Sequence, residues 1–210
     1  LKFILKRVII FIPQLFVVIL ATFLLMRLIP GSPAEAMAGS FATDEMVAAI
    51  EQKMGLDQPL PTQFAIYIKD LLHGDMGISW YTSNPVTKDI AQRFPATFEL
   101  ITYSLILAVI VGVFFGLATS FKPNSLGARL GKGYSLLAGA MPEFWIALLL
   151  IFAFYVTWGL APAPLGRISM AITPPKTVTG MYTVDALLSG NMKAFKSAAS
   201  QLVLPVVTLG

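Results

Sequence analysis

Long, uninterrupted apolar stretches dominate the pattern of this chain. Three of them cover residues 8–26, 98–121 and 134–158, and a fourth apolar run begins at residue 202. A bilayer core of about 30 Å needs about 20 helical residues, because each residue rises about 1.5 Å along the helix axis. A backbone in lipid must satisfy its own hydrogen bonds, so these stretches are expected to be helices. The pattern predicts an all-α polytopic membrane protein with about three complete spans and the start of a fourth.

The segment between the first two spans has the periodicity of small amphipathic helices. Thr43 is expected to cap a helix that ends near Gly55. A second helix is expected from about residue 61, with apolar side chains at Phe64, Tyr67, Ile68, Leu71 and Leu72. A third is expected from about residue 83 to Phe94, because Pro95 follows. The second span would then begin after Pro95, with Glu99 in its first turn.

These boundaries predict three parts. Residues 1–29 form a basic N-terminal segment and the first span, residues 30–96 a small helical external segment, and residues 97–210 the start of a membrane core. Since the fourth apolar run begins only at residue 202, the chain is expected to be part of a longer protein.

The distribution of charge predicts an orientation. Three bases and no acid precede the first span, and residues 122–133 again carry three bases and no acid. Residues 30–96 carry eight acids and four bases. The positive-inside rule therefore places the N-terminus and residues 122–133 in the cytoplasm and residues 30–96 outside. Residues 159–201, with four bases and one acid, oppose the rule but are external by alternation.

The composition narrows the classes of function. Hydrophobic residues make up 56% of the chain and charged residues 12%, against about 25% charged in soluble domains. There is no cysteine and a single histidine, His73, so no metal site or cysteine nucleophile is predicted. No catalytic set can be nominated, and the glycine-rich stretch 127–133 lacks the spacing of a phosphate-binding loop. The expected environment is the lipid bilayer, without nucleic acid.

Two features inside the predicted spans are candidates for function. Gly112 and Gly116 form a GxxxG pair that would allow another helix to pack closely against the second span. Pro142 is expected to kink or open the third span.

The residue after that proline, Glu143, would lie near mid-depth, where an ionisable side chain usually marks a polar pathway. We therefore nominate Glu143, Phe144 and Trp145 as lining a translocation path. The alternative is structural: Glu143 is protonated, or bonded to backbone that the proline frees.

Short motifs resemble those of one transporter family along essentially the whole chain. In order they are LKFILKR (1–7), RLIPGSP (27–33), MGLDQPL (54–60), GDMGIS (74–79), RFPATFEL (93–100), PEFW (142–145) and LPVVTLG (204–210). This ordered set resembles the bacterial dipeptide/oligopeptide/nickel family of ABC-transporter permeases, specifically the subunit with a long first external segment.

The resemblance implies a type I ABC importer permease fold in the bacterial cytoplasmic (inner) membrane. It implies a second homologous permease subunit, two cytoplasmic ATPase subunits that bind ATP and Mg²⁺, and an external solute-binding protein as partners. This chain would end before the coupling loop that contacts the ATPases and would itself hold no cofactor. Glu143 departs from the family, which often has a small uncharged residue there.

The resemblance favours a permease, not an enzyme, with peptides as the solute; nickel complexes and glutathione remain open. The alternative is a membrane-anchored interaction protein that binds a partner through residues 30–96.

Overall fold

A computed structural model describes residues 2–28, 32–39, 42–79 and 81–210 of the chain. The chain divides into two compact units, Leu1–Asp89 and Ile90–Gly210. Within the described residues the regular elements are helices, apart from an isolated bridge between Ile78 and Pro85, so the predicted all-α fold is confirmed.

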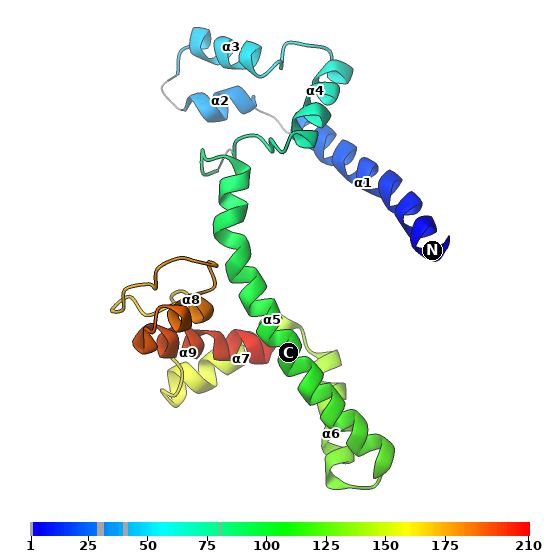
Figure 1. Cartoon of the computed structure of the whole chain (residues 1–210), viewed down its shortest axis with the longest axis vertical. Coiled ribbons are helices and arrows are strands. Elements are labelled where there is room, and N and C mark those ends of the chain that lie inside the picture. Colours follow the sequence, from blue (N-terminus) through cyan, green and yellow to red (C-terminus); the bar gives the residue numbers. More distant parts are fainter. Residues whose placement is uncertain (1, 29–31, 40–41, 80) are drawn as a thin grey trace. The chain divides into compact units, whose positions relative to one another are not determined.

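The helices of Figure 1 have the following bounds: α1 (Lys2–Leu28), α2 (Pro33–Ala38), α3 (Asp44–Lys53), α4 (Leu60–Leu72), α5 (Val86–Phe121), α6 (Leu126–Ala140), α7 (Glu143–Leu150), the π-helical segment η1 (Ile151–Thr157), α8 (Tyr182–Leu188) and α9 (Met192–Leu209). Two of them, α1 and α5, are long and apolar enough to cross a membrane.

The first unit is held together by aromatic packing between α1 and α4. The ring of Phe23 lies 5.2 Å from that of Phe64 and 5.8 Å from that of Tyr67, and Phe16 lies 5.7 Å from Phe64. Pairs of this kind contribute about 0.5–1.5 kcal/mol each beyond the area that they bury. The apolar stripe predicted for the second external helix therefore packs on the first span.

A buried glutamine completes this contact. Gln63 accepts a hydrogen bond from Nε of Arg27 at 2.8 Å and donates to the carbonyls of Leu56 and Gln58 at 2.9 and 2.8 Å. Each polar atom of its side chain thus has a partner, which removes most of the cost of burying it.

The helix predicted after Thr43 is confirmed as α3, since the Thr43 hydroxyl accepts from the backbone N–H of Met46. A short preceding helix, α2, was missed. It begins with a capping box in which Ser32 and Glu35 satisfy each other's backbone N–H groups. The hydroxyl of Ser32 also donates to Glu51 of α3 at 2.6 Å.

The predicted end of a helix at Pro95 is wrong. A single helix, α5, runs through Pro95 for 36 residues and places Glu99 in its interior. Proline removes one helical hydrogen bond, but here its ring is covered by Gly180, where an added Cβ would lie 2.8 Å from the proline ring. Gly180 has φ +81°, so the chain needs glycine there both for its backbone and for this close approach.

The predicted third span is not one continuous helix. Helix α6 ends at Ala140, Met141 and Pro142 are extended, and α7 begins at Glu143. The apolar run then continues from α7 into η1, and together they make a helical segment that is shorter than a span. The proline therefore separates two helices where a kink or a local opening was expected.

The glycine-rich stretch 127–133 lies inside α6 and packs α6 against α5. An added Cβ on Gly131 would lie 2.9–3.1 Å from side-chain atoms of Phe115, and one on Gly127 would lie 3.4 Å from Cβ of Ala118. The rings of Phe115 and Tyr134 stack at 5.9 Å across the same contact. This pair of small residues, four apart, allows the close approach of the two helices.

Replacing Gly131 by alanine tests this packing. Gly131→Ala in the full-length protein should reduce the free energy of unfolding by about 1–3 kcal/mol, because the new methyl group overpacks against Phe115. The matched control is Gly133→Ala, since a Cβ there meets no atom within 4 Å. Thermal unfolding of both variants in detergent is the measurement; equal stabilities would show that the α5–α6 contact is looser than described.

Candidate functional site

Four of the six residues nominated from the sequence lie at the junction of α6 and α7. Pro142 has φ −63° and ψ 137° and immediately precedes α7, whose first turn holds Glu143. Glu143 is exposed, as are Phe144 (68%) and Trp145 (42%). The junction therefore presents the carboxylate and both aromatic rings away from the interior of the second unit.

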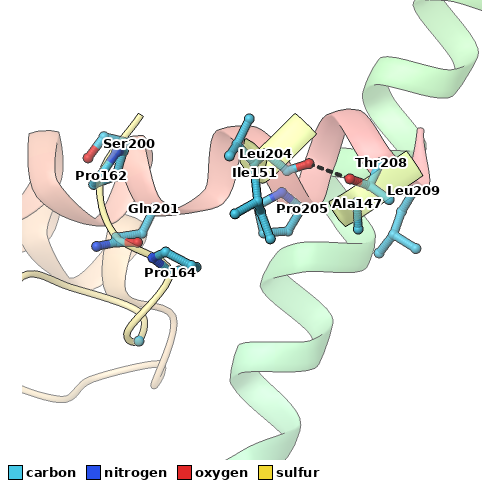
Figure 2. A pocket seen from close by; sticks show the side chains of 11 residues that line it. Ala147, Ile151, Pro162, Pro164, Ser200, Gln201, Leu204, Pro205, Thr208 and Leu209 are labelled. Atoms are coloured by element: carbon cyan, nitrogen blue, oxygen red, sulfur yellow. Dashed lines mark hydrogen bonds between the residues drawn. The ribbon is translucent and has the colours of Figure 1, made fainter. Parts of the chain in front are cut away.

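A cleft of about 340 Å³ lies beside α7, within the second unit. Figure 2 shows it between α7 and η1, the loop that follows η1, and α9. Glu143 is not part of its lining. It lies one helical turn before Ala147 and two before Ile151, which do line the cleft, so these three residues share a face of the helix. The lining is Ala147, Ile151, Pro162, Pro164, Gly166, Ser200, Gln201, Leu204, Pro205, Thr208 and Leu209.

The cleft is mostly apolar with a few polar groups from α9. Pro205 lies inside α9 and cannot donate to the carbonyl of Gln201, one turn earlier. Thr208 donates its hydroxyl proton to the carbonyl of Leu204 at 2.8 Å, the dashed line in Figure 2. Ser200 and the Gln201 amide add donors and acceptors at the side of the cleft. Such a surface offers apolar contact together with hydrogen bonds to amide groups.

A buried carboxylate that the sequence reasoning passed over organises the same unit. Glu99 of α5 is 2% exposed, and its Oε1 accepts from the backbone N–H of Thr183 at 2.7 Å and from the Thr183 hydroxyl at 2.6 Å. Its Oε2 accepts from Nη2 of Arg167 at 2.8 Å and from the N–H of Tyr182 at 3.3 Å. Glu99 therefore caps the N-terminus of α8, which has no cap from its own preceding residue.

Arg167 ties the loop before α8 to this carboxylate. Its Nη2 also donates to the carbonyl of Gly180 at 2.7 Å, and its guanidinium lies 3.8 Å from the centre of the Tyr182 ring. The Thr183 hydroxyl donates its hydrogen bond to Glu99. It therefore accepts one from the Tyr103 hydroxyl, at 2.9 Å. The polar groups that face Glu99 are thus paired, as a buried carboxylate requires.

Asp185 closes the same loop from inside α8. It is 1% exposed and accepts hydrogen bonds from the backbone N–H groups of Val178, Thr179 and Gly180 and from the Thr179 hydroxyl, at 2.7–3.2 Å. Burial by itself would raise the pKa of Asp185, but these hydrogen bonds outweigh it and hold the pKa below its ordinary value.

No local signal in the sequence could have paired Glu99 with Arg167, because 68 positions separate them. The one available hint was the charge of residues 159–201, where Arg167 is the only arginine.

The GxxxG pair of α5 remains a prediction. An added Cβ on Gly112 or on Gly116 would meet no atom within 4 Å in the described part of the chain. Within the described chain this pair therefore has no neighbouring helix. Helices α5 and α6 approach closely at Gly127 and Gly131 of α6 instead.

Removing the charge of Glu99 should loosen the external part of the second unit. Glu99→Gln leaves Arg167 without its counter-ion and should cost about 2–4 kcal/mol, below the figure for fully buried pairs because 31% of the Arg167 side chain is exposed. Hydrogen exchange of residues 167–183 in the full-length protein measures the loss. Glu45→Gln, on the exposed first turn of α3, is the control; unchanged protection in Glu99→Gln would contradict the role of the pair.

Asp185 predicts a pH dependence of defined sign. Because its pKa is lower in the folded state, its stabilisation is complete above the ordinary aspartate pKa of about 3.9 and is lost as the pH falls through the folded value. Asp185→Asn should therefore lower amide protection of residues 178–185 at pH 6 by about 1–3 kcal/mol. That difference between the variant and the native protein should shrink below about pH 4; a difference that grows toward acid pH would contradict this sign.

Comparison with known proteins finds similar membrane components of transport systems. Residues 1–101 match the family model "Binding-prot-dependent transport system membrane comp, N-term". The chain is 40% identical over 188 residues, 90% of its length, to the "Probable D,D-dipeptide transport system permease protein" of Escherichia coli. Over its full length it is 34% identical to the dipeptide transport system permease protein of Alkalihalophilus pseudofirmus and 37% identical to the di/tripeptide transport system permease protein of Pseudomonas aeruginosa. It spans 55–62% of the length of these relatives. The N-terminal 101 residues thus match the membrane components of binding-protein-dependent transport systems, and the chain as a whole is similar to permease proteins of such systems.

Proposed function

We propose that this chain is the greater part of a permease subunit that passes peptides across the bacterial cytoplasmic membrane in an ATP-driven importer. The observation that carries the proposal is its similarity, over 90–100% of its length, to permeases named for dipeptides, D,D-dipeptides and di/tripeptides. The apolar cleft with amide-compatible polar groups supports a peptide as the solute.

The proposed assembly has the partners that the resemblance implies. A second homologous permease would pair with this one, and two cytoplasmic ATPases would bind ATP and Mg²⁺. An external binding protein would deliver the peptide. ATP-driven closure of the ATPases would switch the permease pair between outward-facing and inward-facing states.

The proposed orientation puts the N-terminus and the α5–α6 connection in the cytoplasm. The distribution of basic residues supports it. The Glu99 cluster lies near the end of the apolar part of α5 that would face outward, and it anchors the loop 159–181, which the orientation places outside.

Glu143, Phe144 and Trp145 are proposed to line the path of the solute. In lipid, non-helical backbone is tolerated only where it is buried in protein or lines a cavity. The extended residues 141–142 immediately precede Glu143, and the face of α7 that carries Glu143 leads into the cleft.

Affinity purification of the complete gene product from its own membrane, with mass spectrometry of what accompanies it, tests the function. Recovery of a second permease and two ATPases is expected. Isolation without an ATPase would overturn the proposal and favour a membrane-anchored interaction protein that uses residues 30–96.

Glu143→Gln tests the path. In the complete transporter this variant should change peptide uptake, or peptide-stimulated ATP hydrolysis, by about tenfold, a typical consequence of altering an interaction by about 1.4 kcal/mol. Assembly should be preserved, because the side chain is exposed. Glu45→Gln, another exposed carboxylate in the first turn of a helix, is the matched control; unchanged transport in Glu143→Gln would remove this residue from the path.

A further inference from the structure

The turn of α9 around Pro205 leaves one main-chain carbonyl of the cleft without its helical partner. In an α-helix each carbonyl accepts a hydrogen bond from the N–H four positions later. Pro205 has no N–H to give to Gln201. The hydroxyl of the next turn does not replace it, because Thr208 donates to the carbonyl of Leu204. Gln201 and Pro205 both line the cleft, so the open carbonyl lies on the cleft side of α9.

A carbonyl without a partner is strongly unfavourable at the depth of a membrane. Proline inside a membrane helix is tolerated where a neighbouring group or a water-filled cavity satisfies the carbonyl that it frees. Pro205 is exposed, and the space beside it is the cleft of about 340 Å³. The partner of the Gln201 carbonyl therefore comes from whatever occupies the cleft: water when it is empty, and the N–H of a solute when it is filled.

The side chain of Gln201 adds a free donor at the same place. Ser200 gives its hydroxyl proton to the carbonyl of Ser197 at 2.8 Å, and the Thr208 proton is likewise used within α9. Among the lining residues drawn in Figure 2, the one hydrogen bond runs from Thr208 to Leu204, so the Gln201 amide has no partner there. Gln201 thus offers the cleft both an acceptor and a donor.

The lining of the cleft offers no charge to a solute. None of the 11 described residues that line it is ionisable. The guanidinium of Arg167, which follows the lining residue Gly166, is already bonded to Glu99 and to the carbonyl of Gly180. The cleft is therefore complementary to an uncharged group with one donor and one acceptor, and in a peptide that group is the peptide bond.

We propose that Gln201 determines the specificity of the cleft for the peptide group, with Pro205 as its positioning residue. The main-chain carbonyl of Gln201 accepts a hydrogen bond from a solute N–H, and its side-chain amide donates one to a solute carbonyl. This role rests on the proposed function, because it names the part of the transported peptide that the cleft binds. A carboxylate or an ammonium group would meet no opposite charge in the described lining.

Uptake of two solutes by the complete transporter, reconstituted in vesicles with its binding protein, tests this role. The solutes are L-alanyl-L-alanine and its ester analogue L-alanyl-L-lactate, in which an oxygen replaces the peptide N–H. Pro205→Ala returns an N–H to α9 and occupies the Gln201 carbonyl. The preference in kcat/KM for the amide over the ester should then fall about fivefold, the effect of one ordinary hydrogen bond. The selectivity of the binding protein is the same in every variant and cancels in this comparison.

The matched control for the backbone change is Pro13→Ala. Pro13 is also an exposed proline inside a long apolar helix, α1, and lies outside the cleft, so the preference for the amide should be retained.

A second variant tests the side chain. Gln201→Leu removes the donor but keeps the main-chain carbonyl, so kcat/KM should fall about fivefold for both solutes, since both retain a carbonyl that the amide could bind. Gln201→Asn keeps an amide and should restore most of this loss.

An unchanged amide preference in Pro205→Ala, or an equal fall in Pro13→Ala, would overturn the role of Gln201 and leave the proposed function intact, because peptide uptake would persist. Native uptake in Gln201→Leu would overturn the role as well. Absence of peptide uptake by the native transporter would overturn the proposed function itself, and this role with it.

Discussion

The buried carboxylate of Glu99 is the contact on which the arrangement of the second unit depends. A charge with 2% exposure is strongly unfavourable unless donors surround it, and here the donors come from a loop and a helix far along the chain. By capping α8 and pairing with Arg167, Glu99 fixes residues 167–183 against α5. Helix α9 packs on α8 and forms one wall of the cleft, so Glu99 helps to fix the position of that wall.

Irregular backbone occurs in or next to the helices that line the cleft. The extended residues 141–142 separate α6 from α7, η1 departs from α-helical geometry directly after α7, and Pro205 interrupts the hydrogen bonds of α9. π-helical segments are rare in proteins, and those that do occur are often found at functional sites. In lipid, irregular backbone is tolerated where it is buried in protein or borders a cavity, as it does on both sides of this cleft.

The sequence predicted well the features that depend on neighbouring residues. Periodicity and capping gave the all-α fold, the long apolar helices α1 and α5, and α3 with its cap at Thr43. Two boundaries differ from the prediction, and both lie at prolines, Pro95 and Pro142. Pro95 is tolerated inside α5 where Gly180 covers it, and residues 134–158 are divided between helices instead of forming one span.

The candidate site shows the same limit. The motif around Glu143 was visible because an acid next to a proline is unusual in an apolar stretch. The Glu99–Arg167 pair was not visible, since periodicity cannot relate residues 68 positions apart. Of two glycine pairs with the same spacing, Gly127 and Gly131 contact a helix within the chain, while Gly112 and Gly116 face an open groove. Spacing alone does not say which face of a helix has a neighbour.

A double-mutant cycle on Glu99 and Arg167 tests the central claim most directly. Glu99→Gln, Arg167→Gln and the double variant would be compared by hydrogen exchange of α8 in the full-length permease. If the two side chains act as one pair, the losses are not additive, and the coupling energy is about 1–3 kcal/mol. Additive losses would contradict the account, because they would mean that Glu99 and Arg167 stabilise this unit independently.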